Sequence, residues 1–298
     1  MKTLLFNAKA MGLLLAGRVV TPAMIREDYD RLSAGYDEAF GRHMRKHALE
    51  LTERLRLRPG DRALDLASGT GNVALALAAA VGPTGSVTGT DSSAGMLARA
   101  ETRRRDYGND WLRFREADMR QALLAQPDAS LDVATCGWAI GYESPPSILR
   151  LMARKLKPGG RVGLIENARD TLAPIRDASL TVARAYPGQV RRIMDLHRRL
   201  PRNVRQMGRW CQAAGLTVLD VWEGSEEFRF GSGAEALAWV LRTGAGAGFW
   251  RMMDPARKSE CDALFARYLD ERFADEAAIP AAHHWLACVA RKEGAPCI

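Results

Sequence analysis

The residues with the clearest chemical potential lie in the stretch ALDLASGTGN, residues 63–72. Gly69 and Gly71 predict a tight turn, because glycine tolerates positive φ and carries no side chain that would block a ligand. Asp65 stands inside the short apolar run that precedes this turn. A carboxylate there would repel a pyrophosphate and attract a cation, either directly or through backbone that it orients. The stretch therefore predicts a binding turn for a positively charged ligand.

A dinucleotide is the competing ligand for the same turn. Gly69, Gly71 and Ala74 satisfy the G-x-G-x-x-G/A pattern. Asp91 follows Gly71 by 20 residues, about where a ribose-binding acid belongs. An NAD-dependent oxidoreductase therefore stays open as an alternative. Asp65 argues against it, as do the roughly sixty residues that precede the first predicted strand.

Three further segments follow in a fixed order: VTGTDSSAGML (87–97), EADM (116–119) and LKPGGRVGLIEN (156–167). Together the four segments resemble class I S-adenosylmethionine (SAM)-dependent methyltransferases, of the UbiE-like type that serves ubiquinone and menaquinone biosynthesis. The resemblance covers residues 29–167 well, the last strand weakly and the rest of the chain hardly at all. It implies SAM as cofactor and methyl transfer to a small molecule. One departure is Ala67, which stands where many relatives have the first glycine.

The resemblance places cofactor contacts at the carboxyl ends of the predicted strands. Asp91 would accept the ribose hydroxyls. Asp118 would accept the adenine amino group, with Met119 beside the ring; the alternative for Asp118 is that it caps the next helix. The full set of implied cofactor residues is Asp65, Ala67, Gly69, Gly71, Asp91, Ser92, Met96, Asp118, Met119 and Cys136.

The segment after the fourth predicted strand decides which acceptors fit, because strand ends face the methyl donor in this fold. Enzymes that methylate exocyclic amines of DNA bases carry an Asn/Asp-Pro-Pro-aromatic tetrad there, whereas this chain has CGWA at residues 136–139. DNA is therefore not predicted as a substrate. Trp138 is expected either to form an aromatic wall for the acceptor or to pack in the core.

Three side chains are candidates for a catalytic base: Tyr36, Glu166 and His197. A base is needed only for a hydroxyl or an acidic carbon, because the sulfonium is already a strong electrophile and the protein mainly positions the reactants. By the resemblance, Tyr36 would close over the cofactor; the alternative is that it packs with Tyr29 on one helical face. Glu166, at the mouth of the fifth predicted strand, would orient a substrate or satisfy nearby backbone donors.

Positive charge is concentrated in one stretch. Residues 184–209 hold eight arginines against one acid, a formal +7 of the chain's +8. A run of one sign repels itself, and the planar guanidinium fork suits phosphate or carboxylate. Arg198 and Arg202 are therefore predicted to bind an anion, which could be an acidic small substrate, an anionic membrane surface or nucleic acid; the alternative is a solvated helix face. RNA is disfavoured, because no RNA-binding module accompanies the arginines.

The N-terminal residues 1–20 mix leucines with Lys2, Lys9 and Arg18. This segment is too short to span a bilayer and too interrupted for a signal peptide. It is expected to form a helix that covers the active site or packs on a second subunit of a homodimer. Peripheral contact with a membrane is the alternative, since basic residues flank an apolar face.

Metal and redox sites are not predicted. His43 and His47 have the i,i+4 spacing that could hold a metal ion, but no third ligand is evident, so a solvated basic helix face is expected. The five cysteines form no C-x-x-C pair and their number is odd. Reduced thiols in the cytoplasm are the simplest interpretation.

The predicted fold is α/β. It is a Rossmann-like sheet of seven mostly parallel strands with an antiparallel last strand and helices on both faces, preceded by N-terminal helices. The predicted segments are an N-terminal helical extension (1–50), a SAM-binding core (51–167), a helical insertion on the substrate side (168–215), and the last strands with inserted helices (216–298). The predicted function is methylation of a small molecule; a SAM-binding cyclase or regulator that transfers no methyl group stays open.

Overall fold

The computed structural model describes residues 1–194 and 199–294. They divide into two compact units, each assembled from separate stretches of the chain. Unit 1 comprises Met1–Ala39, Asp170–Arg198 and Ser225–His284, and unit 2 comprises Phe40–Arg169, Arg199–Gly224 and Trp285–Ile298. These units cut across the four segments expected from the sequence, because each of the last two strands contributes residues to both.

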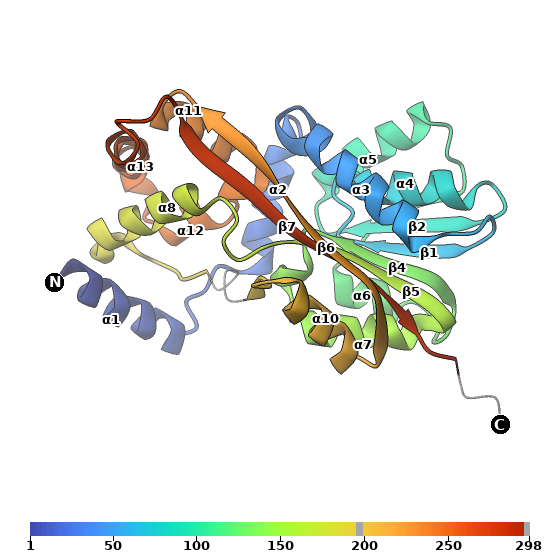
Figure 1. Ribbon diagram of the computed structural model, residues 1–298. Coiled ribbons are helices and arrows are strands. Elements are labelled where there is room, and N and C mark those ends of the chain that lie inside the picture. The colour runs from blue at the N-terminus through green and yellow to red at the C-terminus, as the bar shows by residue number, and fades with distance from the viewer. Residues whose placement is uncertain (195–198, 295–298) are drawn as a thin grey trace. The chain divides into compact units, whose positions relative to one another are not determined.

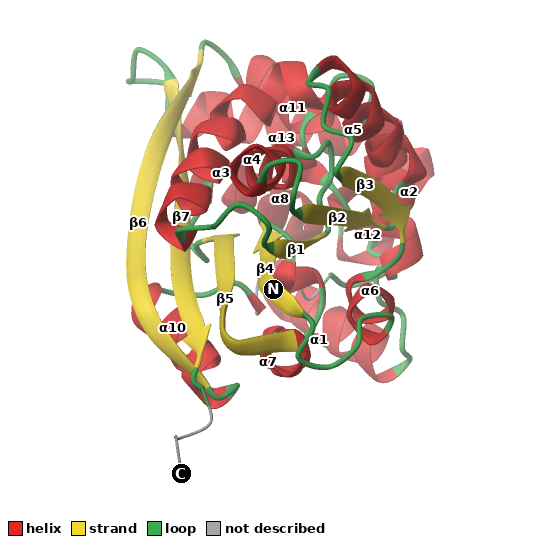
Figure 2. Cartoon of the chain, turned by 90° about the vertical axis from the view of Figure 1, so that its right-hand side faces the viewer, coloured by secondary structure: helices red, strands yellow, loops and turns green. Residues whose placement is uncertain are grey.

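The described strands form a seven-stranded sheet in the order β3-β2-β1-β4-β5-β7-β6. The strands are β1 (Arg62–Leu66), β2 (Ser86–Asp91), β3 (Leu112–Glu116), β4 (Leu131–Gly137), β5 (Leu156–Asn167), β6 (Leu216–Phe230) and β7 (Ile279–Lys292). β1 pairs in parallel with β2 and β4, β3 with β2, and β5 with β4. β7 runs antiparallel to β5, and β6 and β7 are the longest strands (Figure 2). The predicted fold class is confirmed.

Helices cover both faces of the sheet in unit 2 (Figure 1). One face carries α3 (Arg42–Leu55), α4 (Asn72–Val81) and α5 (Ala94–Asp106), and the other carries α6 (Met119–Leu124), α7 (Pro145–Lys155) and α10 (Val204–Ala213). Side chains alternate between the faces of a strand. Ala63 and Val133 accordingly join an apolar cluster with α3 and α4, while Leu64 and Ala134 join a second cluster with α6, α7 and α10. The glycine turn at Gly69 and Gly71 thus follows a strand, β1, that is buried on both faces.

The helices of unit 2 begin where the sequence offers acceptors for free N–H groups. Ser93 Oγ accepts the Met96 N–H at 3.1 Å at the start of α5, which is the usual role of a serine before a helix. Asn203 Oδ1 accepts the Gln206 N–H at 3.0 Å before α10. Pro145 occupies the first turn of α7, where its missing N–H costs nothing. A 3-10 turn, η2 (Ile140–Tyr142), links β4 to α7.

Unit 1 is helical apart from its share of β6 and β7. Its helices are α1 (Lys2–Leu15), α2 (Pro22–Leu32), α8 (Ala173–Ala185), α11 (Gly233–Arg242), α12 (Phe249–Met252) and α13 (Lys258–Arg272). α13 packs against α8 and α11. Asp28 of α2 is buried and accepts hydrogen bonds from the Gly248 N–H at 2.9 Å and from Arg251 Nε at 2.8 Å. These donors compensate the buried charge and fix the glycine-rich segment before α12.

The last strand, β7, begins at Ile279, five residues before the apolar segment HWLACVAR (284–291). The first residues, IPAAH, lack the apolar run that marks the later half, so their pairing comes from tertiary contacts. The glycine-rich segment TGAGAGFW (243–250) contains a 3-10 turn, η4 (Gly244–Gly246), and the first residues of α12. Within the described residues, no helix has both the length and the apolar character that crossing a bilayer requires.

Candidate functional site

The turn after β1 has a backbone conformation that most residues avoid. Ala67, Gly69 and Gly71 have φ angles of +50°, +52° and +88°. The Gly71 N–H donates to the Ser68 carbonyl at 2.8 Å, which closes the turn. A Cβ at Gly71 would lie 3.0 Å from Phe114 Cζ, whereas a Cβ at Gly69 would meet nothing within 4 Å. Gly71 is therefore required by packing, and Gly69 leaves bare main chain beside open space.

Ala67 adopts the left-handed conformation without being a glycine. That conformation costs a residue with a Cβ about 1 kcal/mol. We therefore expect Ala67→Gly to raise the free energy of unfolding by about 1 kcal/mol in a urea titration. Ala129, with the same φ of +50°, is the matched control site, and Ala129→Gly should stabilise similarly. A destabilised Ala67→Gly variant beside a stabilised Ala129→Gly variant would show that the Ala67 methyl group is needed for packing.

Asp91, the last residue of β2, ties the glycine turn to α5. Its Oδ2 accepts the Gly69 N–H at 2.8 Å and its Oδ1 accepts the Ser93 N–H at 2.8 Å. The Asp91 carbonyl accepts the Ala117 N–H at 3.0 Å, which positions the segment after β3. A carboxylate at the carboxyl end of a parallel strand is also a good acceptor for ribose hydroxyls. Asp91 can hold the turn and bind a ligand at the same time.

Asp65 lies on β1 directly before the turn, and its side chain is fully buried. Its Oδ1 accepts the Thr135 hydroxyl on β4 at 2.7 Å. Burial raises the pKa of Asp65 to about 7, although the hydrogen bonds from Thr135 and from the Ala74 N–H favour the ionised form. Asp65 was expected to attract a cation either directly or through backbone that it orients. Because its side chain is buried, the second expectation is favoured over direct contact with the ligand.

The other residues implied to face the cofactor lie near the ends of β2 and β3. Asp118 caps α6: its Oδ1 accepts the Gln121 N–H at 2.7 Å, and Gln121 Oε1 accepts the Asp118 N–H at 3.3 Å. The capping alternative is thus present, and an adenine contact by this exposed side chain stays a prediction. Ser92 is half-buried. The side chains of Met96 and Met119 are 2% and 7% exposed, so they have little surface to offer a ligand.

Glu166, near the end of β5, is fully engaged with backbone. Its Oε2 accepts the Gly141 N–H at 3.0 Å and its Oε1 accepts the Asn167 N–H at 2.8 Å. Burial raises the pKa of Glu166 to about 7, against the hydrogen bonds from Gly141, Asn167 and Ile140. This geometry supports the expectation that Glu166 satisfies backbone donors, and it fixes the segment that follows β4. Cys136 on β4 is likewise buried, which raises the pKa of its thiol well above the usual value.

Trp138 follows β4 in a left-handed conformation, with φ of +54°. Its N–H donates to the Ile165 carbonyl at 2.7 Å, which anchors the backbone to β5. The ring is half-buried and packs against the apolar cluster on the α3 and α4 side. Core packing therefore accounts for part of the ring, and the remaining surface keeps the acceptor wall as a prediction.

The arginine-rich stretch is only partly described. His197 and Arg198, a candidate base and a candidate anion-binding residue, lie outside the described residues. Arg202 is exposed just before α10. Arg199, which was not among the candidates, donates from Nη1 to the Tyr142 carbonyl at 3.1 Å. One guanidinium of this stretch is thereby held against the segment after β4.

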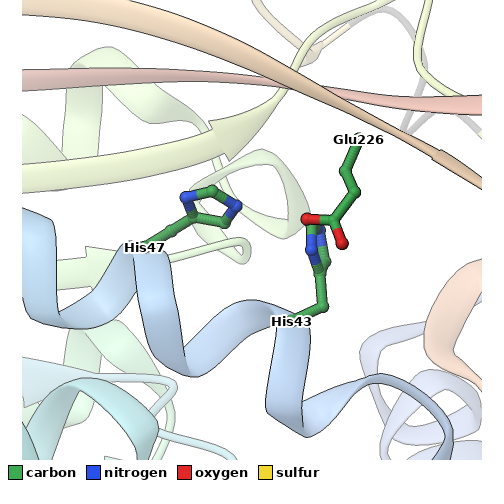
Figure 3. Close-up of side chains that lie close together, drawn as sticks. All are labelled: His43, His47 and Glu226. Carbon is green, nitrogen blue, oxygen red and sulfur yellow. The ribbon is translucent and has the colours of Figure 1, made fainter.

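The expectation of a solvated helix face is wrong for one histidine of α3. His47 is 6% exposed, and its ring centroid lies 4.3 Å from that of Trp285 on β7. The cause is that α3 packs against α4 and β5, which buries this side of the helix. The rings of His43 and His47 lie edge to face, 5.0 Å apart, on successive turns (Figure 3). Glu226, also labelled in Figure 3, belongs to β6 in unit 1.

Tyr36 belongs to unit 1. Its ring packs edge to face on that of Tyr29, with centroids 6.2 Å apart, as the packing alternative expects. Its role as a lid or a base stays a prediction.

Arg103, which was not among the candidates from the sequence, braces the glycine turn after β1. Its Nη1 donates to the Thr70 carbonyl at 2.8 Å and to Asn72 Oδ1 at 2.9 Å. Arg103 begins a run of three arginines at the end of α5, and such a run normally indicates a solvated helix end. Spacing alone offered no signal that the first of them turns back toward the glycines.

The two buried carboxyl groups predict an unusual pH dependence of stability. Their folded-state pKa values, about 7 for Asp65 and about 7 for Glu166, lie above the unfolded values of about 4. Between those limits the folded protein binds more protons than the unfolded chain, so their contribution to stability is present at low pH and is lost as pH rises toward 7. We expect the free energy of unfolding to fall between pH 5 and 8 by roughly 2–4 kcal/mol less in Asp65→Asn than in wild type, as measured by urea titration. An Asp65→Asn variant with the wild-type pH slope would contradict this assignment.

Comparison with known proteins agrees with the geometry. Residues 63–160 match the model of a methyltransferase domain. The chain is 35% identical over 156 residues to a demethylmenaquinone methyltransferase of Geobacillus kaustophilus, covering 50% of this chain and 64% of that protein. It is 32% identical over 163 residues to a 2-phytyl-1,4-naphtoquinone methyltransferase of Synechococcus elongatus, covering 51% of this chain and 66% of that protein. The matches thus span less than two thirds of these relatives' length.

Solved structures share the fold at low identity. The YcgJ protein of Bacillus subtilis superposes with a TM-score of 0.55 at 19% identity, covering 84% of this chain and all of that one. The [4+2]-cyclase SpnF gives a TM-score of 0.51 at 21% identity, covering 84% of this chain and 81% of that one. At such identity only the fold is shared.

Residues 63–160 thus match a methyltransferase domain, and they contribute strands to the Rossmann-like seven-stranded sheet. Among methyltransferases, the sequence similarity is to UbiE-type quinone methyltransferases.

Proposed function

We propose that this protein is a SAM-dependent methyltransferase that acts on a small molecule. The observation that carries the proposal is the turn after β1, where the Gly69 N–H is fixed by Asp91 and a Cβ at Gly69 would meet nothing within 4 Å. This arrangement fits SAM, because a carboxylate at the end of β2 can accept ribose hydroxyls and the bare main chain admits close approach. In its ionised form, the buried Asp65 adds a field that favours a positively charged ligand over a pyrophosphate. When bound, SAM supplies a methyl group on a positively charged sulfur.

The acceptor that we propose is an aromatic ring of the quinone class. The support is sequence similarity to enzymes named for demethylmenaquinone and for 2-phytyl-1,4-naphtoquinone. Trp138, beyond β4, offers the exposed part of an aromatic ring to such an acceptor. Arg202 and Arg198 would bind an anionic group of the acceptor, since guanidinium suits oxyanions.

The protein's part in the reaction is mainly to orient the reactants and exclude water. Glu166 is a positioning residue in this proposal, because its oxygens hold Gly141 and Asn167 and thereby the segment after β4. A proton acceptor is required only for a hydroxyl or an acidic ring carbon, and Tyr36 and His197 are the candidates.

Turnover is tested by incubating the pure protein with SAM and a reduced 1,4-naphthoquinone and following products by mass spectrometry. We expect an acceptor heavier by one methylene group, together with S-adenosylhomocysteine. Binding of SAM without any methylated product from a panel of quinols, phenols and amines would refute the methylating role.

The second candidate is a SAM-binding protein without methyl transfer, such as a cyclase. The observation that favours it is the engagement of both Glu166 oxygens by backbone, which leaves the described part of unit 2 without an obvious base. Mass spectrometry separates the two, because a cyclase product has the mass of its substrate.

We also propose a reducing, cytoplasmic setting. The four described cysteines, Cys136, Cys211, Cys261 and Cys288, are free and buried. This pattern is usual where thiols stay reduced.

A further inference from the structure

The N-terminal helix α1 presents an apolar face to solvent. Leu4, Ala8, Met11 and Leu15 recur at i, i+4, i+7 and i+11, so they share one face; we call these four residues the α1 stripe. Leu4 is 74% exposed, Met11 59% and Leu15 83%. Leu5 extends the stripe on one side and is 54% exposed.

The opposite side of α1 is already occupied. Leu13 is buried, Phe6 and Ala10 are half-buried, and α1 packs against α8 within unit 1 (Figure 1). The chain after the helix is fixed as well, because the Val20 N–H donates to the Ile193 carbonyl at 2.9 Å. The stripe therefore faces outward while its helix is held to unit 1 by the other face.

Exposed apolar side chains are concentrated at this place. Thirteen large hydrophobic residues of the described chain are exposed, and seven of them lie within residues 1–19. The other six are scattered over the remaining helices and strands. Single exposed leucines need no explanation, whereas a contiguous apolar patch marks an interaction surface.

The charge around the stripe identifies the partner. Lys2, Lys9 and Arg18 are exposed, and no Asp or Glu occurs before Glu27. A helix of 14 residues is about 21 Å long, too short to cross a hydrocarbon core of about 30 Å. An apolar face flanked by basic side chains on a short helix is suited to lie in the interface of an anionic bilayer.

We propose that α1 docks this protein on anionic membrane surfaces, with the α1 stripe inserted among the lipid chains and Lys2, Lys9 and Arg18 at the headgroups. The inference goes beyond methyl transfer and does not depend on it. If the acceptor is a quinone with a long isoprenoid tail, the same contact brings the enzyme to the surface where such a molecule resides.

The test is sedimentation of the full-length protein with vesicles of phosphatidylcholine, alone or with about one third phosphatidylglycerol. We expect binding to the anionic vesicles at low salt and at least ten-fold weaker binding to the neutral ones. The triple variant Leu4→Gln, Met11→Gln, Leu15→Gln should bind at least ten-fold more weakly than wild type. The double variant Lys2→Gln, Lys9→Gln should bind the anionic vesicles several-fold more weakly than wild type.

Matched controls separate the stripe from general hydrophobicity and charge. Leu49→Gln, Leu124→Gln, Leu241→Gln removes three leucines that are 49%, 55% and 39% exposed elsewhere, and it should bind like wild type. Arg45→Gln, Lys46→Gln removes two exposed positive charges of α3 and should also bind nearly normally. Equal binding of the stripe triple and the leucine control would overturn the proposal, as would absence of binding by wild type.

A second copy of this chain is the competing occupant of the stripe. Light scattering decides: a wild-type dimer that the stripe triple converts to monomer, without vesicle binding, would overturn the membrane proposal. Vesicle binding by a protein that fails to bind SAM would leave the inference intact and refute only the proposed function.

Discussion

Asp91→Ala is expected to weaken SAM binding by one to two orders of magnitude, which corresponds to about 1.4–2.7 kcal/mol. The carboxylate accepts the Gly69 N–H at 2.8 Å and the Ser93 N–H at 2.8 Å, and it is the group proposed to accept the ribose hydroxyls. Its removal leaves the turn without an anchor and the ligand without an acceptor. Titration calorimetry with SAM measures the loss.

The conservative change Asp91→Asn provides the control. An amide oxygen can accept one of the two N–H groups but offers no charge, so binding should fall to an intermediate extent. Thermal unfolding of each variant establishes the folded fraction at the temperature of the titration. Wild-type affinity in a folded Asp91→Ala variant would remove Asp91 from the cofactor site.

Gly69→Ala is expected to lose mainly SAM affinity, whereas Gly71→Ala is expected to lose mainly stability. At Gly69 the φ of +52° resembles that already adopted by Ala67, and a Cβ there meets no protein atom within 4 Å. This variant should lose only about 1 kcal/mol of unfolding free energy. It should nevertheless bind SAM at least ten-fold more weakly, because the methyl group occupies space that the ligand needs.

At Gly71 the added Cβ would lie 3.0 Å from Phe114 Cζ and 3.3 Å from Ala100 Cβ, on a backbone with φ of +88°. We expect a loss of about 2–3 kcal/mol in unfolding free energy, measured by urea titration. A Gly69→Ala variant that binds SAM normally would mean that the ligand does not approach this turn.

The sequence predicted the elements whose pattern is local. An apolar run, a glycine pair and an alanine-rich helix in succession define β1, the turn and α4, because each depends on residues within a few positions. The caps at Ser93 and Asp118 follow from the same local rules. The sheet and its antiparallel last strand were implied by the resemblance that the four segments carry, rather than by local pattern.

Contacts between residues that lie far apart in the chain could not be predicted from the sequence. Arg103 reaches Thr70 from the end of α5, and Glu166 reaches Gly141 from β5, across separations of 33 and 25 residues. His47 is buried because Trp285 packs on it, a contact between α3 and β7. No periodicity encodes such pairs, since they depend on how completed elements pack.

The most direct test of the central claim is calorimetric titration of the pure protein with SAM, with S-adenosylhomocysteine and NADH titrated in parallel. We expect SAM and S-adenosylhomocysteine to bind saturably at one site per chain, and we expect this binding to be lost in Asp91→Ala. NADH should give no heat of binding. Binding of NADH with none of SAM or S-adenosylhomocysteine would contradict that claim.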